Sequence, residues 1–181
     1  GWSFLDGRFG EFIELLPAQQ RIEATWYQGT ADAVYQNLDL LRRHGPHYVL
    51  VLAGDHVYKM DYGRMLEDHL DARAPLTVAC VDVPLADARS LGVMAVDRDR
   101  RIVHFDEKPP RERLDGLVSD VPGIGPTFLA SMGIYMFSRD LMVRTVSDPK
   151  LVDFGRHIIP KLVPEARVHA YVYRGYWEDV G

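Results

Sequence analysis

The sequence predicts an α/β fold in which a mostly parallel sheet is flanked by helices. Between residues 30 and 43, apolar residues recur at three- and four-residue spacing, as on one face of a helix. The continuous apolar run at 48–53 follows, and it is typical of a strand covered on both faces. Helical and strand-like stretches alternate from there to Tyr173. This alternation is the pattern of an α/β domain.

Each element is assigned from its local pattern. The helix at 30–43 has Asp32 in its first turn, where a negative charge suits the helix dipole, and Gly45-Pro46 to end it. Asp61 is suited to cap a second helix. The inner face of that helix is predicted to consist of Tyr62, Met65, Leu66 and Leu70.

The second half of the chain is predicted to contain a hairpin and a long loop. Residues 97–100 read as the turn between two short strands. Residues 111–127 contain proline and glycine and lack periodicity, so we expect a functional or mobile loop. The remaining stretches are predicted strands at 76–83, 129–137 and 167–173, and helices before Gly92, near 139–146 and near 154–162.

The composition predicts a single water-soluble domain. The 181 residues are 47% hydrophobic and 26% charged, with a formal net charge of −5, which argues against a nucleic-acid-binding surface. No apolar run approaches the roughly 18 residues of a membrane helix. Cys80 is the single cysteine and cannot form an internal disulfide. We therefore expect a cytoplasmic protein.

The ends of the sequence predict an excerpt of a longer protein. The chain begins at Gly1 rather than Met and stops at Gly181, directly after an aromatic and acidic run.

Ligands of open parallel sheets bind beyond the carboxyl ends of the strands, so the residues there are the candidates for chemistry. Asp55 follows the strand at 48–53, and Asp179 follows the strand at 167–173. Mg²⁺ commonly takes one or two carboxylates together with substrate phosphate oxygens. The pair therefore suits a magnesium site. The alternative is that Asp55 only completes a turn after Gly54.

Glu107 and Lys108 follow the strand at 102–105, directly before Pro109. A lysine at this position can hold a phosphate as a point charge, and Glu107 can accept hydrogen bonds from sugar hydroxyls. The alternative is a solvated charge pair at a strand end.

Gln19, Gln20 and the start of the first helix are candidates for nucleotide binding. Small residues at Gly29-Thr30-Ala31 would let a base or a phosphate approach the backbone N–H groups, and a glutamine can read a base edge. The alternative is an ordinary helix cap at Thr30. Neither a G-x-G-x-x-G motif nor a P-loop motif is present in the sequence.

Seven motifs, in order along nearly the whole chain, resemble the family of bacterial glucose-1-phosphate adenylyltransferases. They are residues 16–21 (LPAQQR), 26–34 (WYQGTADAV), 52–58 (LAGDHVY), 105–109 (FDEKP), 130–135 (ASMGIY), 153–155 (DFG) and 177–181 (WEDVG). The resemblance implies a Rossmann-like nucleotide-diphospho-sugar transferase fold. It also implies the conversion of ATP and α-glucose 1-phosphate into ADP-glucose and pyrophosphate, for glycogen or starch synthesis.

The resemblance also implies roles for individual residues. Asp55 would be the main catalytic carboxylate and would hold Mg²⁺ with Asp179. Lys108 would bind the phosphate of glucose 1-phosphate and act in catalysis. The glucose pocket would be lined by Glu107, Ser131, Gly92 and Asp179. The nucleotide would lie against Tyr27, Gly29, Thr30 and one of Gln19 or Gln20.

By the same resemblance, residues 1–181 are a partial catalytic domain. The family's glycine-rich signature would lie before Gly1 and a β-helix domain after Gly181, so the excerpt alone is expected to be inactive. The full-length protein is expected to be an allosteric homotetramer. Two alternatives are a related transferase that uses UTP or dTTP and a non-catalytic regulatory subunit of the same fold. Asp106 stands where many members have an apolar residue.

Overall fold

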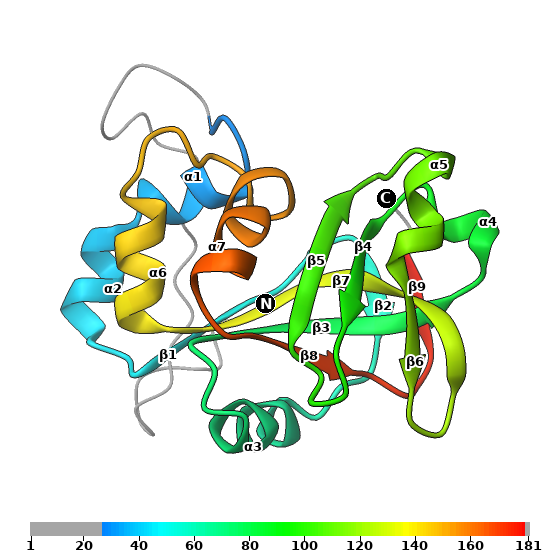
Figure 1. Ribbon diagram of the computed structural model, residues 1–181. Coiled ribbons are helices and arrows are strands. Elements are labelled where there is room, and N and C mark those ends of the chain that lie inside the picture. The colour runs from blue at the N-terminus through cyan, green and yellow to red at the C-terminus, as the bar shows by residue number, and fades with distance from the viewer. Residues whose placement is uncertain (1–26, 180–181) are drawn as a thin grey trace.

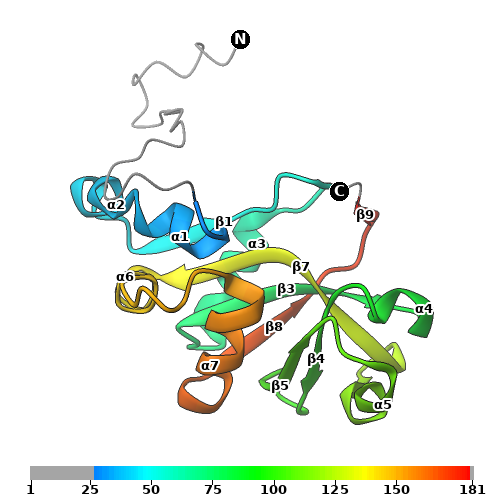
Figure 2. The same cartoon turned by 90° about the horizontal axis from the view of Figure 1, so that it is seen from above.

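The computed structural model describes residues 27–179, with the backbone alone at Asp179, and it confirms the α/β class. A long strand, β7 (Gly125–Ser138), is the centre of a seven-stranded sheet. One side of β7 pairs with β3 (Leu76–Val83), and β3 pairs in turn with β8 (Val168–Val172). The views in Figures 1 and 2 show β7 and β3 side by side across the molecule.

The other side of β7 is shared by three strands. Its C-terminal part pairs with β1 (Tyr48–Val51), and its N-terminal part pairs with β4 (Gly92–Val96) and β6 (Val118–Val121). Strand β5 (Ile102–Glu107) extends the sheet beyond β4. The apolar core lies on both faces, since neighbouring residues of β3 such as Val78 and Ala79 belong to different clusters.

The prediction of a mostly parallel sheet is wrong for the strand pairs of the described residues. One pair, β3–β8, is parallel, and the others are antiparallel. For two of the antiparallel pairs, β4–β5 and β6–β7, the reason lies in a tight connection. Strands β4 and β5 are joined by the predicted turn at 97–100, and β6 and β7 by residues 122–124. Such short connections can join only antiparallel neighbours.

The predicted helix at 30–43 is two helices, α1 (Thr30–Tyr35) and α2 (Leu38–His44). The break lies at Asn37, whose side-chain amide donates to the Ala33 carbonyl at 2.8 Å and to the Tyr27 hydroxyl at 3.1 Å. An asparagine side chain that bonds to a nearby backbone group competes with helix formation. The predicted stop is confirmed, because Gly45 ends α2 with a left-handed φ of 56°.

The predicted cap of α3 (Tyr62–Asp71) is confirmed. The Asp61 carboxylate accepts from the backbone N–H groups of Gly63 and Arg64 at 2.9 and 3.4 Å. The predicted inner face is wrong at Leu70, which is 46% exposed, whereas Met65 and His69 are buried. Residues four apart lie on one helix face, so His69 rather than Leu70 continues the line of Met65.

The predicted loop at 111–127 is wrong, because most of it is ordered structure. It contains α5 (Arg111–Leu114), the 3₁₀ turn η1 (Asp115–Leu117) and strand β6, and β7 already begins at Gly125. Leu114, Leu117 and Val121 are buried and anchor the segment in the core. These three residues are three and four positions apart, yet they belong to three successive short elements rather than to one helix.

The remaining elements complete the two ends of the molecule. They are α4 (Leu85–Ala88), α6 (Arg139–Val146), the π-helix η2 (Phe154–Ile158), α7 (Ile159–Glu165) and a separate strand pair, β2 (His56–Tyr58) with β9 (Trp177–Asp179). Figure 1 shows α1, α2, α6 and α7 gathered at one end and α4 and α5 at the other. No helix of residues 27–179 is long and apolar enough to cross a membrane.

Candidate active site

The sheet is split at the middle of β7. Strand β1 pairs with β7 as far as Val51, opposite Tyr135, whereas the pairing of β4 begins at Val93, opposite Ala130. Within the described chain, no strand pairs with residues 131–134 on that side of β7. The register with β3 also shifts here, and Gly133 has a φ of 67°, as expected at a bulge. The split therefore opens space above the centre of the sheet.

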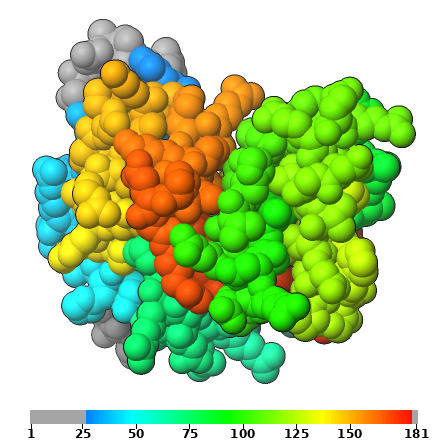
Figure 3. Space-filling view, viewed as in Figure 1, coloured from blue at the N-terminus to red at the C-terminus, as the bar shows by residue number. Residues whose placement is uncertain are grey.

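A cavity of about 620 Å³ lies at this split. It is lined by the connection after β1, the end of β5, the centre of β7 and the starts of α1 and η2. The space-filling view shows the surface hollowed between the orange η2–α7 segment and the green strand β5 (Figure 3). The polar side chains that line the cavity are Thr30, Asp55, His56, Glu107, Tyr135 and Asp153. Three of the predicted site residues, Thr30, Asp55 and Glu107, thus meet in one place.

The Glu107 carboxylate lies between two glycines. A Cβ atom on Gly92, its register partner in β4, would lie 2.7 Å from Glu107 Oε2, and one on Gly155 would lie 2.6 Å from the same atom. Any side chain at either position would displace the carboxylate. Burial, followed by the nearby charge of Asp153, raises the pKa of Glu107, and the Lys108 and Arg156 cations oppose that shift.

Asp153 and Tyr135 are site residues for which the sequence had suggested no role. Asp153 caps η2 by accepting from the Arg156 N–H at 2.9 Å, and its other carboxylate oxygen accepts from the Thr30 hydroxyl at 3.4 Å. Burial raises the pKa of Tyr135 to about 12, a hydrogen bond from Ser131 opposes this, and the charges of Glu107 and Asp153 add to it. The available signal was the acidic residue directly before a helical stretch in the 153–155 motif.

Ser131 lies at the start of the bulge in β7. Its hydroxyl accepts from the Gly133 N–H at 3.2 Å, and its hydrogen bond to Tyr135 connects it to a side chain that lines the cavity. Of the predicted sugar-pocket residues, Glu107 lines the cavity, Gly92 lies against the Glu107 carboxylate, and Ser131 is not among the lining residues.

At the start of α1, two backbone N–H groups are already used within the protein. The N–H groups of Ala31 and Asp32 donate to the Val152 carbonyl at 2.9 and 3.1 Å, so they are not offered to a phosphate. The helix cap is Gly29 rather than Thr30, and a Cβ atom on Gly29 would collide with the same carbonyl oxygen. Small residues are needed here for packing against the segment that leads to Asp153.

Of the predicted nucleotide-binding residues, one is found at the cavity. Thr30 lines the cavity, and its hydroxyl accepts from the Phe154 N–H at 3.3 Å. The Tyr27 hydroxyl accepts from the Asn37 amide. Gln19 and Gln20 lie outside the described residues.

Asp55 and Asp179 are brought together by the small strand pair. In the register of β2 and β9, Asp179 lies opposite His56, the residue next to Asp55. The Asp55 side chain is 60% exposed, and its Oδ1 atom lies 3.5 Å from His56 Nε2. An exposed carboxylate beside the backbone of a second aspartate is an arrangement that can receive a cation and a phosphate.

Lys108 is exposed at the end of β5 and is not among the residues that line the cavity. Its backbone is held in a left-handed conformation, with a φ of 51°, and its N–H donates to the Leu91 carbonyl at 3.0 Å. On its N-terminal side, Asp106 forms an ion pair with Arg113 of α5 at 3.0 Å. The chain is thus constrained at Lys108 and just before it.

The α/β fold carries a carboxylate-lined cavity at an opening in its sheet, an arrangement suited to a polar ligand, and comparison with known proteins identifies the class of enzyme. The family model described as nucleotidyl transferase matches residues 4–181, and the chain belongs to this family.

Among curated proteins, the chain is similar to glucose-1-phosphate adenylyltransferases. It is 51% identical to the enzyme of that name from Nitrosospira multiformis, with all of this chain and 45% of the relative aligned. It is also 51% identical to glucose-1-phosphate adenylyltransferase 2 of Alkalilimnicola ehrlichii and to the enzyme from Dechloromonas aromatica, covering 44% and 43% of those proteins. The chain thus spans less than half the length of these relatives.

Proposed function

We propose that the full-length protein is a glucose-1-phosphate adenylyltransferase, which joins ATP and α-glucose 1-phosphate into ADP-glucose and pyrophosphate. The observation that carries this proposal is the cavity in which Glu107, Asp153 and Asp55 meet at the split in the sheet. The identity of about half of the residues to enzymes of this name supports the choice of substrates. A magnesium-dependent, allosteric homotetramer that serves glycogen synthesis in the cytoplasm is the form we propose on the resemblance alone.

Glucose is proposed to bind between Glu107, Asp153 and Ser131. Sugar hydroxyls are hydrogen-bond donors, and ionised carboxylates are acceptors only, so two facing carboxylates select a polyhydroxylated ligand. Burial is the main cause of the raised pKa of Glu107, and donation from sugar hydroxyls would relieve the repulsion from Asp153 that adds to it. Gly92 and Gly155 leave the space that the Glu107 carboxylate needs.

The phosphate of glucose 1-phosphate is proposed to bind Lys108, the exposed residue next to Glu107. One of its oxygens would then attack the α-phosphorus of ATP, and pyrophosphate would leave. Both substrates are anionic, so charge repulsion and poor alignment are the main barriers. The Lys108 ammonium would lessen the repulsion, and its constrained backbone would help to orient the sugar phosphate.

The residues at Asp55 fit a magnesium ion. An exposed carboxylate next to the backbone of Asp179 agrees with the preference of Mg²⁺ for one or two carboxylates plus phosphate oxygens. Asp55 and Asp179 would hold the ion, and the ion would supply neutralisation of phosphate charge. His56, at 3.5 Å from Asp55, would help to orient that carboxylate.

The substrate choice is tested by comparing kcat/KM of the full-length protein with ATP, UTP and dTTP at a fixed concentration of glucose 1-phosphate. We expect ATP to be preferred. A preference for UTP or dTTP would reject the adenylyl specificity, and no turnover with any of the three would favour a regulatory subunit.

The Asp55→Asn variant should lower turnover by about 10²-fold or more, the scale for loss of one preorganised electrostatic group.

A further inference from the structure

The strand pair β2–β9 is small and stands apart from the main sheet. Each strand has three residues, and the pair is a sheet of its own. A two-stranded pair of this size has little stability in isolation. Yet its register decides how close the backbone of Asp179 lies to Asp55. Other contacts must therefore hold the pair in place.

The connection from β8 to β9, residues 173–176, is the strap that carries β9. It leaves the main sheet at Tyr173, whose N–H donates to the Cys80 carbonyl at 2.8 Å. The Tyr173 side chain is buried, and its hydroxyl lies 2.7 Å from the Lys59 carbonyl and 3.4 Å from the Tyr176 carbonyl. Lys59 directly follows β2, and Tyr176 directly precedes β9. One hydroxyl therefore contacts the flanks of both strands.

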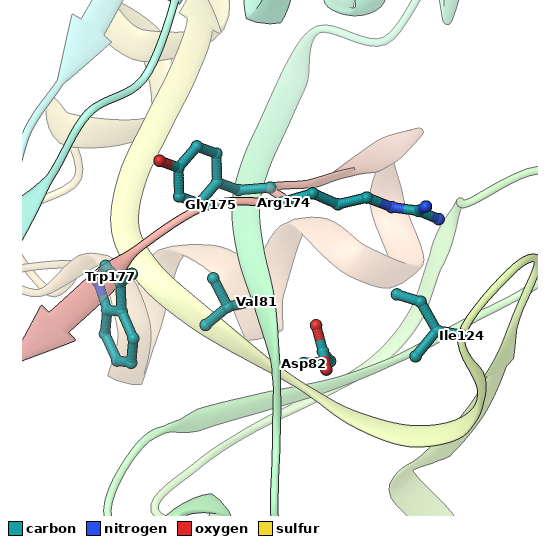
Figure 4. Close-up of a pocket in the computed structure, with 7 residues that line it drawn as sticks. Val81, Asp82, Ile124, Arg174, Gly175 and Trp177 are labelled. Carbon is teal, nitrogen blue, oxygen red and sulfur yellow. The ribbon is translucent and has the colours of Figure 1, made fainter.

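Packing beneath the strap is open. A hollow of about 300 Å³ separates the strap from the end of β3. Figure 4 shows Arg174, Gly175 and Trp177 on one side of it and Val81 and Asp82 on the other. A hollow provides few van der Waals contacts. The position of the strap therefore depends more strongly on the hydrogen bonds of Tyr173.

Two further contacts of this region also indicate that Tyr173 positions the strap. A Cβ atom on Gly175 would collide with the Tyr173 hydroxyl, so the strap is shaped around that group. The Trp177 ring packs edge-on against the His56 ring, with 5.4 Å between centroids, and His56 lies beside Asp55. A displacement of the strap would thus be transmitted to Asp55 as well as to Asp179.

We propose that Tyr173 is a positioning residue that holds β9 against β2 and thereby sets the placement of Asp55 and Asp179 for the cation. This inference rests on the proposed metal site. It assigns to Tyr173 an effect on metal affinity and not on the sugar pocket, because its contacts lie on the strap and the flanks of β2 and β9.

The test is a Tyr173→Phe substitution in the full-length protein, with Mn²⁺ as the probe. Binding of Mn²⁺ in the presence of ADP-glucose is followed by electron paramagnetic resonance, and KM for glucose 1-phosphate is measured at saturating Mn²⁺. We expect the Mn²⁺ dissociation constant to rise about tenfold or more, the scale for loss of a group that orients metal ligands. KM for glucose 1-phosphate should stay within about twofold. Backbone amides of β2 and β9 should also exchange hydrogen faster.

Two variants make the outcome decisive. Tyr171→Phe removes a hydroxyl from β8 and should change neither quantity, whereas Gly175→Ala should displace the Tyr173 hydroxyl and reproduce the metal effect even if Tyr173→Phe fails to fold. An unchanged Mn²⁺ dissociation constant in Tyr173→Phe, or an equal weakening of metal and sugar phosphate, would overturn the proposal. Unchanged Mn²⁺ binding in Asp55→Asn would instead reject the metal site itself.

Discussion

At the scale of single residues, the cavity contains carboxylates whose negative charge is disfavoured by burial and by a neighbouring carboxylate. Glu107 is half-buried, faces Asp153 and is enclosed by Gly92 and Gly155. A site that binds a polyhydroxylated ligand gains from such acceptors only when the ligand is present. In the free protein, the same arrangement lowers stability. Function and stability are therefore expected to oppose each other at Glu107.

The substitution Glu107→Gln separates the two effects. KM for glucose 1-phosphate should rise about tenfold or more, because a charged acceptor is lost. The free energy of unfolding should rise near neutral pH, because the amide has no charge to be buried or repelled. The raised pKa means that the wild type loses stability as pH rises through that pKa, so the advantage of the variant should grow with pH.

Urea unfolding at several pH values and steady-state kinetics measure these effects for Glu107→Gln. Glu112→Gln, at an exposed position of α5, is the matched control and should leave both quantities nearly unchanged. A loss of stability in Glu107→Gln that is independent of pH would contradict the proposed strain.

Lys108 should affect one substrate only. Lys108→Gln is expected to raise KM for glucose 1-phosphate by about tenfold or more while the KM for ATP stays within about twofold, because the lost charge is assigned to the sugar phosphate. Lys150→Gln, at an exposed position remote in sequence, should change neither. Equal increases for both substrates would show that the phosphate role is wrong.

At the scale of elements, caps and turns were predicted well, whereas strand pairing and a helix break were not. The Asp61 cap and the turn at 97–100 depend on a few neighbouring residues, and both were found as expected. The antiparallel pairing of β7 and the break at Asn37 depend on partners distant in sequence or on side-chain competition. Periodicity alone carries no information about either.

The same division holds for the site. Asp55, Glu107 and Thr30 were identified from strand ends, a helix start and motifs, and they meet in the cavity. Asp153 lies within the 153–155 motif, but the sequence indicates no role for it, and in the structure it caps η2. Only the fold shows that this cap faces Thr30 and influences Glu107.

Helix α3 gives an element-scale prediction. Asp68 connects α3 to the rest of the sheet through a bidentate pair with Arg100, at 2.7 and 3.2 Å, and through His169 Nε2 at 2.8 Å. Asp68→Ala should lower the free energy of unfolding by about 2 kcal/mol, since it leaves partly buried partners without their acceptor. Asp71→Ala, at an exposed position of the same helix, should stay within about 0.5 kcal/mol of the wild type in urea titrations. Equal losses in the two variants would show that the Asp68 network adds nothing to the helix.

At the scale of the whole molecule, the cavity and the buried histidines occupy different parts of the fold. The split beside β7 holds the cavity, whereas His69 of α3 and His169 of β8 are buried where α3 packs against the sheet. His69 Nδ1 lies 2.7 Å from the Thr77 hydroxyl, and His169 binds Asp68. Burial lowers the pKa of both imidazoles, and each proton on His169 would further disfavour one on His69.

This arrangement predicts instability of the whole fold in acid. Because both folded-state pKa values lie below the ordinary value of about 6.5, the unfolded chain binds more protons than the native chain below that pH. The free energy of unfolding should therefore fall as pH drops from 7 to 5, with a slope of at most about 1.4 kcal/mol per pH unit for each histidine.

His169→Gln retains a donor for Asp68 but cannot titrate, so its curve of unfolding free energy against pH should be flatter than that of the wild type. His47→Gln, which alters an exposed histidine, is the matched control. Urea unfolding at half-unit pH intervals measures the slopes, and parallel curves for the wild type and His169→Gln would exclude His169 as the source of acid sensitivity.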